Sequence, residues 1–153
     1  LAGFCYGGGL ASSPAASAAE EDRPVSVLVS YYGSALPTLL HRAPAVDVPS
    51  LHHFGTADAF IPLEQVERIR EAVTAGGARE QVRFVLHEGA GHAFDNPHPG
   101  LHHAAASEAA WRQTLDVLAE VLPARGCPRR APTDPSRRPS REPEWRSTPD
   151  VTE

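Results

Sequence analysis

Lysine and methionine are absent from the 153-residue chain, and cysteine occurs only twice. The two cysteines, Cys5 and Cys127, lie far apart in the sequence, which excludes a disulfide-dense scaffold. No apolar run approaches the roughly 20 residues that a membrane-spanning helix needs, and no basic stretch followed by an apolar core marks a signal peptide at the N-terminus. These absences predict a soluble, cytoplasmic protein with no membrane partner.

Positive charge is scarce in most of the chain. Residues 1–123 contain 7 arginines against 14 aspartates and glutamates. Binding to a phosphate backbone needs a clustered basic face, which this segment does not offer. The charge balance therefore excludes a nucleic-acid partner for the body of the protein.

The last thirty residues differ in composition from the rest. Residues 124–153 combine six prolines with arginine, serine and acidic residues, and they contain almost no apolar side chains apart from Trp145. Such a segment cannot bury enough surface to offset its ordering entropy. We expect residues 1–123 to fold and residues 124–153, with Cys127, to form a disordered tail. Its arginine pairs could contact an acidic partner, but a solvated tail is the favoured interpretation.

Apolar runs alternate with helical patterns along residues 1–123. The runs at 25–32, 51–54 and 82–86 predict strands, and the first is apolar enough to be buried on both faces. Segment 62–73 and segment 104–122, with Trp111, Leu115, Leu118 and Leu122, have helical spacing. Segment 7–19 is Ala-rich and predicts a helix kinked at Pro14. This alternation predicts an α/β fold with a mostly parallel sheet.

The segment Gly3-Phe4-Cys5-Tyr6-Gly7 matches the pattern of a nucleophile elbow, with cysteine in place of the commoner serine. In such a turn the nucleophile occupies a strained backbone position, and glycines two residues away on each side avoid collisions. The turn also presents the N–H of the next residue, here Tyr6, to a developing oxyanion at the helix N-terminus. A Gly-rich connector with a buried cysteine is the alternative.

Two further residues follow in the chain order that α/β-hydrolases use, which is nucleophile, acid and histidine. Asp58 follows the strand at 51–54, and His92, flanked by Gly91, follows the strand at 82–86. The carboxyl ends of parallel strands are where open α/β sheets build their sites. Cys5, His92 and Asp58 thus supply a thiol, a base and an orienting carboxylate. Asp58 could instead be only a turn or capping residue, and His92 only one of eight histidines.

Three of the other histidines, His98, His102 and His103, lie close together in the sequence. No cysteine or acidic ligand accompanies them at a familiar metal-binding spacing. We therefore expect neither a metal site nor a cofactor.

Together, the segments GFCYGG, YYG, HHFGTADAFIP and HEGAGHAFDN resemble the dienelactone hydrolase family of α/β-hydrolases over about residues 1–122. The resemblance implies an α/β-hydrolase fold and cleavage of an ester or lactone without a cofactor. It also implies that Cys5 is the nucleophile, Asp58 the triad acid and His92 the triad base, with the Tyr6 amide in the oxyanion hole.

This chain departs from the family pattern in two respects. The family fold has several strands before the elbow strand, whereas this chain begins at the elbow strand without an initiator methionine. We therefore expect a C-terminal portion of a longer protein, whose remainder holds the second oxyanion donor, an activating glutamate and one substrate-binding arginine. A second family arginine, shortly after the histidine, is replaced here by the run Ala93-Phe94-Asp95-Asn96, so dienelactone itself is not the expected substrate. A catalytically silent α/β-hydrolase-like module with a binding or scaffold role is the alternative function.

Overall fold

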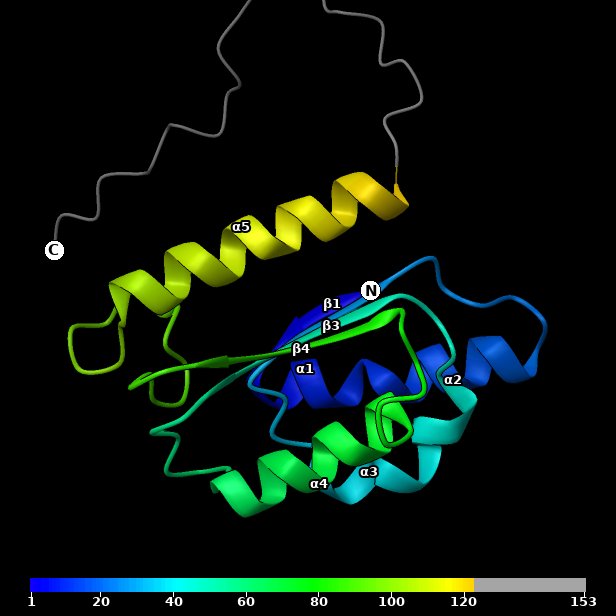
Figure 1. Cartoon of the computed structure of the whole chain (residues 1–153), viewed down its shortest axis with the longest axis horizontal. Helices are drawn as coiled ribbons and strands as arrows, with labels where there is room; N and C mark the ends of the chain where they lie inside the picture. Colours follow the sequence, from blue (N-terminus) through cyan, green and yellow to red (C-terminus); the bar gives the residue numbers. More distant parts are fainter. Residues whose placement is uncertain (123–153) are drawn as a thin grey trace, which may run out of the picture. The chain divides into compact units, whose positions relative to one another are not determined.

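A computed structural model describes residues 1–122, and four parallel strands form its centre. The strands lie side by side in the order β1-β2-β3-β4, as Figure 1 shows. Their bounds are Ala2–Phe4 for β1, Leu28–Tyr31 for β2, Ser50–Gly55 for β3 and Val82–His87 for β4. Because all pairings are parallel, the carboxyl ends of the four strands meet at one edge of the sheet.

Helices cover both faces of the sheet, which confirms the predicted α/β class. The helix α5 lies on one face and α1 to α4 lie on the other (Figure 1). The bounds are Cys5–Leu10 for α1, Ser12–Glu20 for α2, Leu36–Leu39 for α3, Leu63–Thr74 for α4 and Ala104–Val121 for α5; a 3₁₀ helix, η1, spans Leu40–Ala45.

Alternating side chains of the central strands supply a separate core to each face. On the α5 face, Val29 and Leu51 pack with residues of α5 such as Val117. On the opposite face, Phe54 packs with Val66 and Ile69 of α4. The strands β2 and β3 are buried along their whole length, as a sheet covered on both faces requires.

Several predicted boundaries need correction. The first predicted strand, 25–32, is reduced to β2, while the weakly predicted strand at 51–54 is the fully buried β3. The predicted helix at 7–19 is two helices separated at Ala11, because Pro14 has no N–H to bond the carbonyl of Leu10. Pro62 is the N-cap of α4 and does not lie in its first turn. The predicted disordered tail, with Cys127 and Trp145, lies outside the described residues.

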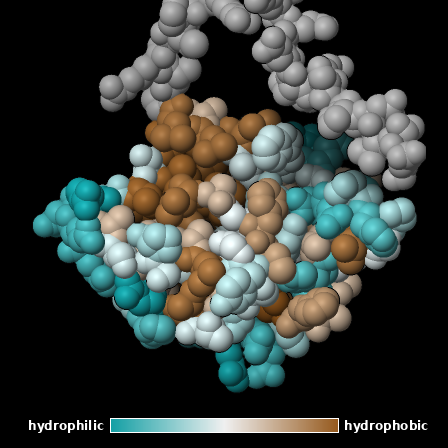
Figure 2. All heavy atoms as spheres, turned by 180° about the vertical axis from the view of Figure 1, so that it is seen from behind, coloured by the Kyte–Doolittle hydropathy of each residue, from teal (hydrophilic) through white to brown (hydrophobic). Residues whose placement is uncertain are grey.

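Most of the large apolar residues that are helically spaced in segment 104–122 lie outside the buried face of α5. Trp111 is 56% exposed, and Leu115 and Leu122 are each 48% exposed. The small residues Ala106, Ala110 and Thr114, together with Val117, face the sheet. Exposed apolar side chains also occur at Leu1 and at Phe4 of β1, and Figure 2 shows hydrophobic surface gathered on the side of the molecule that Figure 1 hides.

The glycines of α1 allow a direct test of how closely α1 packs against the start of α3. A Cβ added at Gly9 would lie 2.5 Å from the backbone nitrogen of Ala35, whereas one added at Gly7 would meet nothing within 4 Å. We expect Gly9→Ala to lower the free energy of unfolding by about 1–3 kcal/mol through overpacking. Gly7→Ala should cost nothing, because alanine favours the helix. Urea denaturation of the two variants measures the difference, and equal midpoints would contradict it.

Candidate active site

Four loops meet at the carboxyl edge of the sheet, and each brings a residue of the candidate site. Cys5 follows β1 directly, Tyr32 follows β2, Asp58 follows β3 by a short loop, and His92 follows β4. This is the edge at which open α/β sheets build their sites, and the structure therefore brings the three sequence-predicted side chains together.

The turn at Cys5 has the strained conformation that the sequence predicts. Cys5 has a φ of 52°, in the left-handed region that non-glycine residues rarely occupy. A Cβ at Gly3 would lie 2.5 Å from the carbonyl oxygen of Gly7, so glycine is required at position 3. The same requirement was predicted for Gly7 and is wrong there, because its Cα faces open space.

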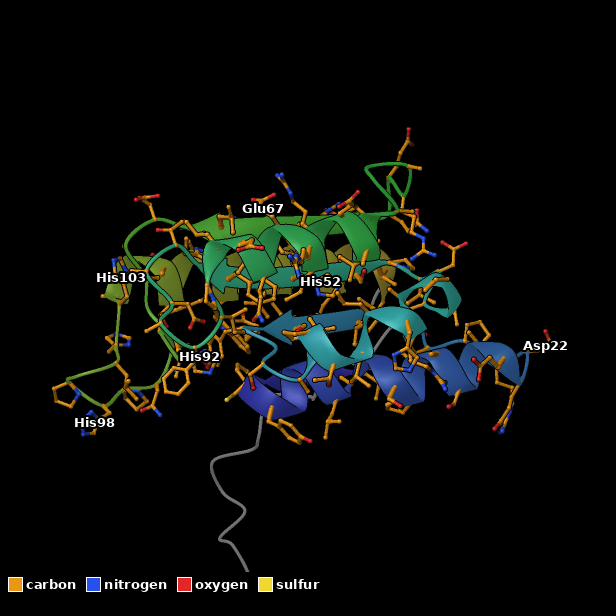
Figure 3. All side chains as sticks on the ribbon, turned by 90° about the horizontal axis from the view of Figure 1, so that it is seen from below. Asp22, His52, Glu67, His92, His98 and His103 are labelled. Carbon is orange, nitrogen blue, oxygen red and sulfur yellow. The ribbon has the colours of Figure 1, made fainter. Side chains whose placement is uncertain are left out.

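A chain of hydrogen bonds connects the three side chains. Sγ of Cys5 lies 3.1 Å from Nε2 of His92, and Nδ1 of His92 lies 2.8 Å from Oδ2 of Asp58. Figure 3 shows His92 in the loop region at this end of the molecule. The imidazole can therefore accept a proton from sulfur on one side while the carboxylate fixes it on the other.

Asp58 makes the hydrogen bonds that both interpretations of this residue require. Its side chain is fully buried, and its Oδ1 accepts hydrogen bonds from the backbone N–H groups of Phe60 and Ile61 at 2.8 and 3.0 Å. Its other oxygen holds His92. The turn role and the orienting role use different oxygens of one carboxylate, so they do not compete.

The electrostatics of the pair favour charge separation. The hydrogen bond with His92 lowers the pKa of the Cys5 thiol, and this outweighs its partial burial; Ser34 and the Tyr6 backbone N–H lower it further. Burial lowers the pKa of His92, but the hydrogen bonds with Cys5 and Asp58 outweigh burial and raise it. The thiol is thus a better proton donor, and the imidazole a better acceptor, than either group is in water.

The sequence reasoning missed two neighbours of Cys5 and His92. Oγ of Ser34 lies 3.7 Å from Sγ of Cys5, and the Ser34 N–H donates to the Cys5 carbonyl at 3.1 Å. The ring of Tyr32 lies edge-on to that of His92, with centroids 5.1 Å apart. The quoted YYG segment contains Tyr32, and its place at the end of a buried strand was the available signal.

Beside His92 the surface opens into a cleft of about 380 Å³, lined among others by Phe60, Leu101 and His102. The ring centroid of Phe60 lies 5.0 Å from that of His92, and Phe60 is 76% exposed. The exposed Phe60 ring next to the imidazole is an apolar surface against which a small apolar group can pack.

The three histidines that lie close together in the sequence precede α5. His98 and His102 are exposed, and the His103 ring caps α5 by accepting from the Ala106 N–H at 3.2 Å. Within residues 1–122, no group of three or more histidine, cysteine or acidic side chains is arranged to hold a metal ion. In the same part of the chain, no helix is long and apolar enough to cross a membrane.

The parallel sheet, its flanking helices and the positions of these residues after successive strands define an α/β-hydrolase-like protein. The chain belongs to the dienelactone hydrolase family, whose model matches residues 1–122. Carboxymethylenebutenolidase of Pseudomonas putida is 35% identical over 122 residues, which cover 79% of this chain and 48% of that protein. The enzyme of the same name from Pseudomonas sp. strain P51 is 33% identical, with 79% and 47% covered.

Solved structures agree with this assignment. A Klebsiella pneumoniae protein assigned as a dienelactone hydrolase superposes with a TM-score of 0.65 at 27% identity, covering 78% of this chain and 50% of that one. TT1662 from Thermus thermophilus gives a TM-score of 0.59 at 25% identity, covering 82% and 55%. The chain spans about half the length of the curated relatives that it matches.

The lowered pKa of Cys5 predicts how its reactivity depends on pH. Alkylation requires the thiolate, so iodoacetamide should modify Cys5 at a lower pH than Cys127, with a rate that rises as the thiolate forms and then levels off. His92→Ala removes the chief cause of the lowered pKa and should move the profile of Cys5 to higher pH. His98→Ala, at an exposed histidine, is the matched control. Identical pH profiles for His92→Ala and the wild-type protein would contradict the prediction.

Proposed function

We propose that the protein hydrolyses a small ester or lactone, with Cys5 as nucleophile, His92 as general base and Asp58 as the residue that orients His92. The single observation that carries this proposal is the unbroken chain of hydrogen bonds from Cys5 Sγ to the buried Asp58 carboxylate. Membership of a hydrolase family supports the reaction class.

The proposed reaction has two steps. His92 Nε2 takes the proton of the Cys5 thiol, and the thiolate attacks the carbonyl carbon. The tetrahedral intermediate collapses to a thioester as the alkoxide leaves with the proton from His92. A water molecule, deprotonated by His92, then attacks the thioester, releasing the carboxylic acid and returning the proton to sulfur.

The Tyr6 backbone N–H supports the oxyanion part of this proposal. It lies at the start of α1, directly after the strained turn, and is close enough to the sulfur to lower the pKa of Cys5. A donor in this position stabilises negative charge that develops on the carbonyl oxygen during attack. The exposed Tyr6 side chain is not required for this role.

Substitutions at the three residues test the proposal. In the complete natural protein, we expect Cys5→Ala to lower hydrolysis of 4-nitrophenyl acetate by at least about a thousandfold, and Asp58→Asn by about 10²–10⁴-fold. Cys127→Ala and His98→Ala, outside the hydrogen-bonded chain, should retain turnover. If Cys5→Ala keeps most of its activity, Cys5 is not the nucleophile. A protein whose wild-type form shows no hydrolysis and an unreactive Cys5 would instead support a binding or scaffold module.

We further expect residues 1–153 alone to be poorly stable and nearly inactive. The strand β1, which directly precedes Cys5, is an edge of the described sheet, and Phe4 on it and the preceding Leu1 are exposed. An uncovered edge with apolar side chains invites aggregation. Chemical unfolding and hydrolysis of a chromogenic ester measure both properties. A cooperatively folded monomer with ordinary esterase turnover would contradict the prediction.

A further inference from the structure

The side chain of Asp95 lies beside the candidate site, three residues after His92 in the chain. Its Oδ1 accepts a hydrogen bond from the Tyr32 hydroxyl, and the carboxylate is partly exposed. We infer that Asp95, positioned by Tyr32, selects substrates by charge: the site favours esters or lactones that are neutral or positively charged next to the scissile bond over those that carry a carboxylate there. The inference rests on the proposed hydrolysis at Cys5.

Tyr32 is held firmly enough to fix the position of Asp95. It is only 3% exposed, and its backbone N–H donates to the His53 carbonyl at 2.7 Å. Its ring packs edge-on against the His92 ring and against that of Phe94, with centroids 5.1 and 5.3 Å away. One rigid aromatic ring therefore contacts both the imidazole of the proposed base and the carboxylate of Asp95.

The hydroxyl group of Tyr32 is a lasting donor to Asp95. Burial raises the pKa of Tyr32, and the Asp95 carboxylate and the nearby Cys5 raise it further. The hydroxyl therefore remains protonated and keeps donating to Asp95. Tyr32 contacts Asp95 through its hydroxyl and the His92 ring through its own ring, and Nε2 of His92 lies 3.1 Å from Sγ of Cys5. A group bound at the sulfur therefore lies within the electrostatic reach of Asp95.

Within residues 1–122, no arginine ion pair involves Asp95. The Asp58 carboxylate is fully buried and bonded to three N–H groups, so it does not face an incoming substrate. Six of the seven arginines in residues 1–122 pair with acidic side chains elsewhere: Arg23, Arg42, Arg68, Arg70, Arg79 and Arg83. The seventh, Arg112, lies on α5.

Charged thiol reagents test the inference without requiring turnover. We would treat the complete natural protein with two methanethiosulfonates, one bearing a trimethylammonioethyl group and the other a sulfonatoethyl group. Mass spectrometry of the Cys5 peptide gives the rate of each reaction, and Cys127 is an internal reference. Asp95→Asn should lower the ratio of cationic to anionic rates at Cys5 by about tenfold and leave the ratio at Cys127 unchanged.

Asp22→Asn is a matched control, because it removes the same charge by the same substitution. Figure 3 shows Asp22 and His92 at opposite ends of the molecule, and asparagine tolerates the left-handed backbone at position 22. The ratio at Cys5 should stay within about twofold of wild type. A ratio for Asp95→Asn that is also within about twofold overturns the inference. If Asp95→Asn fails to fold, Tyr32→Phe replaces it. Without the Tyr32 hydroxyl the Asp95 carboxylate is no longer held in place, so the ratio of cationic to anionic rates at Cys5 should fall at least about threefold. An unchanged ratio in Tyr32→Phe overturns the inference.

Hydrolysis of charged esters separates this inference from the proposed function. The substrates are 4-nitrophenyl acetate, the 4-nitrophenyl half-ester of succinate and the 4-nitrophenyl ester of 4-(trimethylammonio)butyrate. Relative to acetate, Asp95→Asn should raise kcat/KM about tenfold for the anionic ester and lower it for the cationic ester. Hydrolysis that survives Cys5→Ala removes the proposed function and the inference with it. Hydrolysis that depends on Cys5 but shows unchanged charge ratios overturns the inference alone.

Discussion

The close packing of β1 against the first turn of α1 is the constraint on which the rest of the site depends. Gly3 leaves no room for a side chain beside the Gly7 carbonyl, so the chain turns from strand to helix within one residue. Cys5 occupies that residue with a left-handed backbone, a conformation that costs of order 1–3 kcal/mol and persists only when its surroundings impose it. The result is a thiol that projects from the sheet edge, where the loops after the other strands can reach it.

Parallel strand order then determines which residues meet the thiol. The strand β1 pairs with β2, which pairs with β3, and β3 pairs with β4, so the loops with Tyr32, Asp58 and His92 all emerge at the same edge. The His92 imidazole lies between Cys5 and Asp58 and is hydrogen-bonded to both side chains. Asp58 holds its own loop through one oxygen and His92 through the other, so the stability of the loop and the orientation of the His92 ring depend on the same buried carboxylate.

The sequence was sufficient for those features that local rules determine. The apolar runs and their alternation with helical patterns predicted the fold class, and the glycine at position 3 and the order of Cys5, Asp58 and His92 predicted which side chains lie together at one edge. The helices α3 and η1 were not predicted, since Leu36–Leu39 and Leu40–Ala45 carry little periodic signal and contain prolines. The helical spacing at 104–122 predicted α5 but not its buried face, because large apolar residues such as Trp111 are exposed while small ones allow close approach to the sheet. The hydrogen bond from Tyr32 to Asp95 joins loops 63 residues apart, and no local pattern reports such a contact.

The histidines on and next to the sheet differ in their burial and in their hydrogen-bond partners. Behind the site, Nδ1 of His53 lies 3.1 Å from Nε2 of His87, and Nε2 of His53 lies 3.3 Å from the Thr114 hydroxyl of α5. Burial lowers the pKa of His53 to about 3 and also lowers that of His87, so both remain neutral. His53 connects β3 to α5 through Thr114, and its bond with His87 connects β3 to β4. His92 alone among these three is bonded to a thiol and a carboxylate, which raise its pKa. A histidine in this core is therefore a neutral structural group, whereas the histidine at the sheet edge can accept a proton. The difference in pKa depends on whether acidic groups lie within hydrogen-bonding distance of the imidazole.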